Sequence, residues 1–117
     1  MKHLNELLTE KNEMVVKGQF VEAIEKFFAA DARTVDFTGS KVNGKEAILK
    51  GQKKTVEAIQ KVHEITLHSS GVGDDVTYAE FTFDFDTKDG NHIHWHEIIV
   101  SKWKNGKIEH EEYFKGL

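Results

Sequence analysis

Side-chain character alternates most regularly in the second half of the chain. Between Asn91 and Trp103 successive residues change character at a period of two, which predicts a central β-strand. One side of that strand carries Ile93, Trp95, Glu97, Ile99, Ser101 and Trp103. The other side carries His92, His94, His96, Ile98, Val100 and Lys102. Neither side is wholly apolar or wholly polar, so the side that faces the interior decides which residues can form a site.

Three further segments after residue 60 show the same alternation. They predict strands at Val62–Val72, Val76–Thr87 and Lys107–Phe114. The separators Asp89-Gly90 and Asn105-Gly106 are typical of tight hairpin turns, because both pairs tolerate positive φ. The sequence therefore predicts a four-stranded antiparallel meander.

The first half of the chain has helical spacing instead. Apolar residues predict helices over Leu4–Val16, from Phe20 to about Ala30, and from Asn43, as the expected cap, to about Gln60. Between the last two, the β-branched segment Arg33–Phe37 predicts a strand followed by a loop. This order, α-α-β-α-β-β-β-β, predicts an α+β fold in which a strongly twisted, mixed or antiparallel sheet wraps around three helices as a cone. Such a cone leaves a cavity at its wide end.

Length and composition indicate one globular domain over residues 1–117, with 38% hydrophobic and 31% charged residues. The chain has no cysteine, no apolar run long enough for a signal peptide and no stretch of about eighteen apolar residues. We therefore expect a cytoplasmic protein that does not enter a membrane. The net charge of -4 gives no field that would attract nucleic acid, so nucleic-acid binding is not expected.

Several strings, in their order along the chain, resemble the nuclear-transport-factor-two-like superfamily, and within it the SnoaL-like and ketosteroid-isomerase-like branches. The strings are Lys17–Phe20, Phe28–Ala32, Val42–Ile48, Asn105–Ile108 and the closing Glu112–Phe114. The resemblance spans nearly the whole chain and implies a single domain with the cone-shaped fold. The superfamily contains isomerases, cyclases, dehydratases, hydrolases and non-catalytic domains, so the fold by itself implies no single activity.

The resemblance also implies a catalytic position. Asp36 stands where ketosteroid-isomerase-like members carry their general base, at the end of the first strand. The positions of that family's oxyanion-supporting tyrosine and acid hold Lys11 or Asn12, and Ile99. Because those donors are missing, steroid-type isomerisation by that arrangement is not expected. Lys11 itself is expected at the surface.

If the central strand faces inward as the superfamily's does, the cavity receives Trp95, Glu97 and Ile99. Burial would raise the pKa of a carboxyl group there into a range useful for acid or base catalysis. A two-residue Asp89-Gly90 turn would add Asp84 beside Trp95 and Thr82 beside Glu97. The alternative is that this side meets solvent and that the core is formed instead by Phe81, Phe83 and Phe85.

The last hairpin has two possible registers. A two-residue Asn105-Gly106 turn sends His110 and Glu112 to the cavity side, whereas a longer loop with a bulge sends Glu111 and Tyr113 there. Cross-strand charge pairing favours the first register and the family pattern favours the second. We place Glu111 and Tyr113 in the cavity.

The histidine side of the central strand allows two interpretations. Two imidazoles at His-x-His spacing can share a metal ion, but a third ligand is needed and the expected neighbours are Phe83 and Phe85. We therefore predict no metal. Instead this face is expected to pair two copies of the chain in a homodimer. The residues predicted to make that contact are Phe81, Phe83, His94, His96 and Ile98.

These observations predict a protein that binds a small, largely apolar organic molecule without a cofactor. If it is an enzyme, we expect an isomerase, cyclase or lyase that removes a proton from a carbonyl compound. Asp36 would be the base, Glu97 or Asp84 the acid or second base, Tyr113 a hydrogen-bond donor and Trp95 a wall of the pocket. The alternative is a non-catalytic ligand-binding or dimeric assembly domain.

Overall fold

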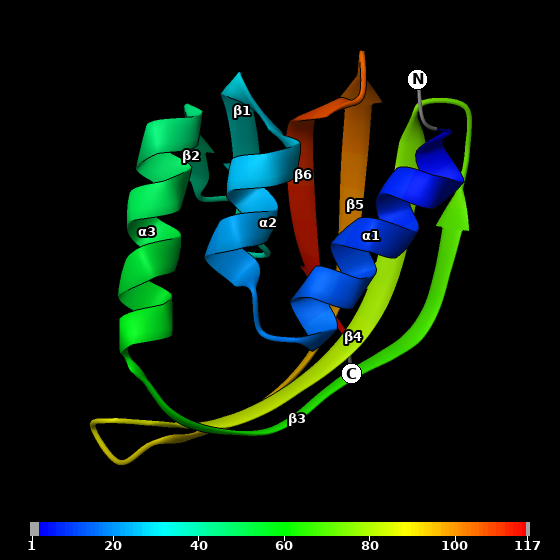
Figure 1. Ribbon diagram of the computed structural model, residues 1–117. Coiled ribbons are helices and arrows are strands. Elements are labelled where there is room, and N and C mark those ends of the chain that lie inside the picture. Colours follow the sequence, from blue (N-terminus) through cyan, green and yellow to red (C-terminus); the bar gives the residue numbers. More distant parts are fainter. Residues whose placement is uncertain (1–2, 117) are drawn as a thin grey trace.

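The protein is an α+β domain, described here for residues 3–116 of a computed structural model. Its elements are α1 (Leu4–Val16), α2 (Phe20–Phe27), β1 (Phe28–Val35), β2 (Lys41–Asn43), α3 (Lys45–Glu57), β3 (Ile59–Val72), β4 (Val76–Thr87), β5 (His92–Lys104) and β6 (Lys107–Lys115). The strands form one sheet in the order β2-β1-β6-β5-β4-β3. Figure 1 shows the sheet curving around the helices, which lie against one of its faces. The predicted fold class and element order are therefore confirmed.

The sheet is mixed because one of its pairings is parallel. β1 runs parallel to β6, and the other four pairings are antiparallel. The predicted meander of β3 to β6 is present. In the described residues no helix is both long and apolar enough to cross a membrane.

The segment after α2 differs from the prediction. The helix ends at Phe27 and β1 begins at once with Phe28, which pairs with Ile108 of β6. Phe28 and Ile108 are both almost fully buried, so pairing with the sheet outweighs the helical spacing that extended the prediction to Ala30. The predicted loop before Asn43 contains a three-residue strand, β2, which pairs with the end of β1.

The start of α3 also differs from the prediction. Asn43 belongs to β2 and pairs with Arg33, while Gly44 occupies the cap position with φ 93°. Its N–H donates to the Ala32 carbonyl at 2.7 Å, which ties the helix start to β1. A residue with a side chain is strained at that φ, so glycine is required here and the predicted Asn43 cap is wrong.

The hairpin between β4 and β5 is one residue longer than predicted. Thr87 N–H donates to the Asn91 carbonyl at 2.8 Å, so the loop contains three residues, Lys88-Asp89-Gly90. Phe83 consequently pairs with Trp95. Because a slip of one residue exchanges the two faces of a strand, every side chain of β4 faces the opposite way from the prediction.

Three phenylalanines of β4 therefore share the inner face with Trp95, Glu97 and Ile99. Phe81 and Phe83 are 0% and 8% exposed, and Phe85 is half-buried beside them. The inward position of Trp95, Glu97 and Ile99 agrees with the first alternative; of the second, the phenylalanine core is present, whereas exposure of the Trp95 side to solvent is wrong. The placement of Asp84 and Thr82 in the cavity is wrong, since they pair with His94 and His96 on the outer face.

The same register alters the predicted dimer surface. Phe81 and Phe83 lie inside the cone, so of the residues predicted to make that contact only His94, His96 and Ile98 remain outside. Dimerisation through the outer face stays a prediction, and it no longer rests on the phenylalanines.

The last hairpin combines the two predicted registers. Asn105 and Gly106 form the two-residue turn, with φ 53° and 77°, and Trp103 pairs with Ile108. The register then shifts by one residue, so that Lys102 pairs with His110 and Glu109 is the extra residue of a bulge. The bulge turns Glu111 and Tyr113 toward the inner face.

Replacing Phe81 with alanine tests which face of the sheet is the core. We expect Phe81→Ala to lower the free energy of unfolding by about 3–5 kcal/mol, because it empties a fully buried site. Phe114→Ala, at an outer-face position that is 46% exposed, is the matched control and should cost less than about 1 kcal/mol. Urea denaturation of both variants measures the difference, and equal losses would contradict the face assignment.

Candidate functional site

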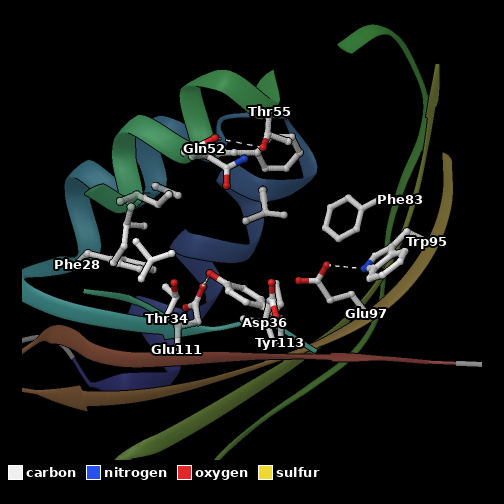
Figure 2. Close-up of a pocket in the computed structure, with 18 of the residues that line it drawn as sticks. Phe28, Thr34, Asp36, Gln52, Thr55, Phe83, Trp95, Glu97, Glu111 and Tyr113 are labelled. Carbon is white, nitrogen blue, oxygen red and sulfur yellow. Dashed lines mark hydrogen bonds between the residues drawn. The ribbon is translucent and has the colours of Figure 1, made fainter. Parts of the chain in front are cut away.

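A cavity of about 540 Å³ lies between the inner face of the sheet and the three helices, and every helix and strand of the domain contributes to its wall. Most lining side chains are apolar. Figure 2 shows Thr34, Asp36, Glu97, Glu111 and Tyr113 at the sheet side of the cavity, and Gln52 and Thr55 opposite them on α3. The polar lining residues are Lys11, Thr34, Asp36, Gln52, Thr55, Glu97, Glu111 and Tyr113.

The structure brings most of the predicted site residues together. The lining contains Asp36, Trp95, Glu97, Ile99, Glu111 and Tyr113. Asp84 and Thr82 are the two that lie elsewhere. Among the polar lining residues the prediction missed Lys11, Thr34, Gln52 and Thr55. Two of these, Lys11 and Gln52, have a signal in the sequence. Each continues the apolar stripe of its helix, Lys11 three residues after Leu8 and Gln52 four residues after Ile48.

Glu97 is the carboxyl group with the most unusual environment. It projects from β5 into the cavity beside Trp95, whose Nε1 donates a hydrogen bond of 2.9 Å to its Oε2 (Figure 2). Burial raises the pKa of Glu97 from 4.5 to about 7; the Trp95 hydrogen bond and Lys11 oppose this rise, and the charge of Glu111 adds to it. Glu97 can therefore both accept and release a proton near neutral pH.

Glu111 has a different environment although it lies in the same cavity. Its Oε2 is 3.1 Å from Lys11 Nζ and accepts a hydrogen bond of 2.7 Å from Ser101 Oγ. Its Oε1 accepts a hydrogen bond of 2.7 Å from the Tyr113 hydroxyl. Glu111 and Lys11 are 3% and 4% exposed, so the expectation that Lys11 is solvated is wrong. A buried carboxylate with these partners is a structural anchor.

Tyr113 keeps its proton. Burial raises the pKa of its hydroxyl well above the ordinary value, and the neighbouring charge of Glu111 raises it further. Because the hydroxyl hydrogen is donated to Glu111, the free side of the oxygen can only accept a hydrogen bond. The predicted role of Tyr113 as a donor would require that bond to break.

Asp36 lies at the rim of the cavity, in the turn after β1, and is exposed. Its Oδ1 accepts hydrogen bonds from Thr38 N–H at 2.9 Å and Ser40 N–H at 3.0 Å, and from the Thr38 hydroxyl. The Thr38 hydroxyl bond is the largest of the effects that lower the pKa of Asp36. Asp36 is thus a weaker base than Glu97.

Aromatic side chains line the rim beside Asp36. The Phe37 and Trp95 ring centroids are 5.0 Å apart, and Lys115 Nζ lies 5.0 Å from the Trp95 ring and 5.8 Å from the Phe37 ring. Phe37 is 51% exposed, so it can move more easily than the buried wall. Phe37 and Trp95 thus form an aromatic rim beside Asp36, with the Lys115 ammonium group over both rings.

Comparison with known proteins agrees with this architecture. A family model described as the SnoaL-like domain matches residues 3–115. The chain belongs to the SnoaL-like family. A search of curated proteins found no significant match.

Solved structures of SnoaL-like and related proteins share the fold. A proposed SnoaL-like polyketide cyclase from Mesorhizobium loti has a TM-score of 0.83 and 24% identity, and the match covers 97% of this chain and 99% of that one. A hypothetical protein from Catenulispora acidiphila with a ketosteroid-isomerase-like fold, solved with trimethylamine, has a TM-score of 0.76 and 20% identity over 96% and 86% of the chains. A proposed hydroxylase from Streptomyces galilaeus has a TM-score of 0.76 and 13% identity over 96% and 87%. At these identities the likeness establishes the fold alone.

The Lys11–Glu111 pair gives a test of the buried network. Lys11→Met should lower the free energy of unfolding by about 3–5 kcal/mol, because it leaves the Glu111 carboxylate buried without its cation. Adding Glu111→Gln should recover part of that loss. Lys53→Met, at an exposed position of α3, is the control and should change stability by less than about 0.5 kcal/mol. A loss in Lys11→Met no larger than in the control would contradict the buried pair.

The pKa of Glu97 makes stability depend on pH. Since this pKa is higher in the folded chain than the ordinary 4.5, the folded state binds the extra proton between about pH 4.5 and 7, and stability falls as pH rises through that window. Glu97→Gln removes the ionisable group and therefore the cost of burying its charge at high pH. It should stabilise the protein by about 2 kcal/mol more at pH 8 than at pH 5 in urea denaturation. Glu46→Gln, at an exposed position of α3, should show no such difference, and a pH-independent effect of Glu97→Gln would refute the raised pKa.

Proposed function

We propose that this protein binds a small, largely apolar carbonyl compound in the cavity and removes a proton from the carbon next to the carbonyl, with Glu97 as the base. The observation that carries the proposal is a carboxyl group of pKa about 7 in a cavity of about 540 Å³ with mainly apolar walls. A pocket of this size suits a single small organic molecule. A base whose pKa is close to the working pH transfers protons efficiently in both directions.

The chemistry needs no group beyond the chain and the substrate. The Glu97 carboxylate takes the proton and leaves an enolate, and the protonated carboxyl can then return it to another carbon of the same molecule. Isomerisation follows directly, while loss of a leaving group or ring closure would follow from the same enolate. The Trp95 hydrogen bond holds Oε2, so Oε1 is the oxygen that can meet the substrate.

The choice of substrate class rests on the walls and on the family. The ring of Phe83 and that of Phe20, 5.9 Å apart, form an apolar surface that suits a ring or chain of carbon. One relative is described as a proposed polyketide cyclase, and polyketides carry carbonyl groups beside acidic C–H bonds. Both observations support an apolar carbonyl compound and leave its identity open.

Stabilisation of the enolate oxygen is the most demanding part of the proposal. Tyr113 and Lys11 are both engaged with Glu111. Gln52, which Figure 2 shows facing the cavity from α3, offers an amide donor for this purpose. A well-placed donor at a developing oxyanion contributes strongly to catalysis.

The engaged donors also favour a second candidate, a non-catalytic ligand-binding domain. In that case the cavity would hold its ligand through the aromatic walls, and Glu97 would only accept a hydrogen bond. The two candidates predict the same binding and differ in proton exchange.

Isotope exchange in deuterated buffer distinguishes them. Apolar ketones and diketones that bind, as judged from tryptophan fluorescence, should lose their acidic C–H signals in proton NMR, at a rate that rises with pH around 7. Glu97→Gln should lower the exchange rate by at least about 100-fold. Asp36→Asn, at the rim, should keep most of it.

Two results would overturn the assignment. Binding without exchange would make the protein a binding domain. Exchange lost in Asp36→Asn but kept in Glu97→Gln would move the base to Asp36, the position that the family resemblance implies.

A further inference from the structure

The outer face of the sheet carries a second set of side chains that the cavity does not use. His63 of β3, Asp86 of β4 and His92 of β5 converge there, and their ligand atoms all lie within 4.8 Å of one another. We propose that His63, Asp86 and His92 form a binding site for a divalent transition metal ion such as Zn²⁺.

The register of the sheet creates this cluster. Asp86 pairs directly with His92, where the shorter predicted loop would have placed Thr87. In β3 the register shifts between Val62 and Glu64, so His63 is the extra residue of a bulge. The bulge turns its ring toward Asp86. Two of the three ligands, His63 and Asp86, therefore come from neighbouring strands, and His92 is the one histidine of β5 that joins them.

The contacts within the cluster suit shared coordination. His63 Nε2 lies 2.8 Å from Asp86 Oδ2, and His92 Nδ1 lies 2.8 Å from Asp86 Oδ1. An ion placed between the two rings could bind one nitrogen from each and a carboxylate oxygen after small side-chain rotations. Imidazole with one carboxylate is a donor set that selects Zn²⁺, Ni²⁺ or Cu²⁺ over Mg²⁺ and Ca²⁺.

Asp84 supplies the outer contact that such a site needs. Its Oδ1 is shielded from solvent, accepts no hydrogen bond among the described residues and lies 3.0 Å from His92 Nε2, close enough to accept a proton from that nitrogen after a small rotation. A carboxylate at the second nitrogen of a ligating histidine orients the ring and strengthens its bond to the metal. The contact favours Nδ1 of His92 as the ligand atom.

The site would keep open positions for water. The side chains of His63, Asp86 and His92 are 35%, 40% and 56% exposed. Three protein ligands on an exposed surface leave at least one position of a tetrahedral ion free. This arrangement lies on the face of the sheet opposite the cavity, so the metal would not take part in the chemistry proposed for Glu97.

Equilibrium dialysis of the untagged full chain against Zn²⁺, with Mg²⁺ in parallel, tests the proposal. We expect one Zn²⁺ per chain and no retained Mg²⁺. His92→Ala and Asp86→Asn should each weaken Zn²⁺ binding by at least about tenfold, and Asp84→Asn by about tenfold through the lost outer contact. Circular dichroism would show that each variant is folded.

His110→Ala is the matched control, since His110 also lies on the sheet but is bonded to Arg33 and Glu112. It should leave Zn²⁺ binding unchanged. Absence of retained Zn²⁺ would overturn the site. An equal loss of Zn²⁺ binding in His110→Ala and His92→Ala would also overturn it, because it would indicate nonspecific binding by surface histidines.

Discussion

The register of the hairpin between β4 and β5 is the constraint on which the rest of the structure depends. The bond from Thr87 N–H to the Asn91 carbonyl closes a three-residue loop, and from it follow eleven cross-strand pairs between β4 and β5. The loop is reinforced by its own side chains. Asn91 N–H donates to the Thr87 hydroxyl at 3.1 Å, and the Thr87 hydroxyl donates to Asp89. Because strands alternate, this one closure assigns every side chain of both strands to the cavity or to the outer face.

Inside the cone, Glu111 and Glu97 carry the same carboxyl group but have different roles, because their surroundings differ. Glu111 has a cation and two hydroxyl donors, so its charge is compensated where it lies. Glu97 has a single indole donor, and burial dominates its pKa. Glu111 therefore links Lys11, Ser101 and Tyr113 in the wall of the cavity, whereas Glu97 is available to a ligand. The same low polarity that raises the pKa of Glu97 would also strengthen its contact with a bound molecule.

Much of the fold could be predicted because it depends on periodicity. Strand alternation over Asn91–Trp103 and the helical spacing over Leu4–Val16 do not require knowledge of distant contacts. The cavity residues of β5, Trp95, Glu97 and Ile99, followed once the family resemblance fixed the inward side of that strand. What could not be predicted depends on single inserted residues. Three single residues each shift a strand register, and no pattern in the sequence identifies them. They are the bulge residues His63 and Glu109 and the third residue of the loop at Lys88–Gly90. Burial of Lys11 was missed for a related reason, since only its partner Glu111, a hundred residues later in the chain, makes that burial tolerable.

The loop at Lys88–Gly90 has a consequence for how such a chain can vary. Surface loops usually tolerate changes in length, because their ends are held by the elements that they connect. Here the removal of one exposed residue would favour the shorter turn, which would carry acids into the cone and aromatic rings out to the solvent. A change of length at this tip would therefore disturb the core itself, although the loop is exposed. Among related chains, the length of this loop should therefore vary less than its residues do.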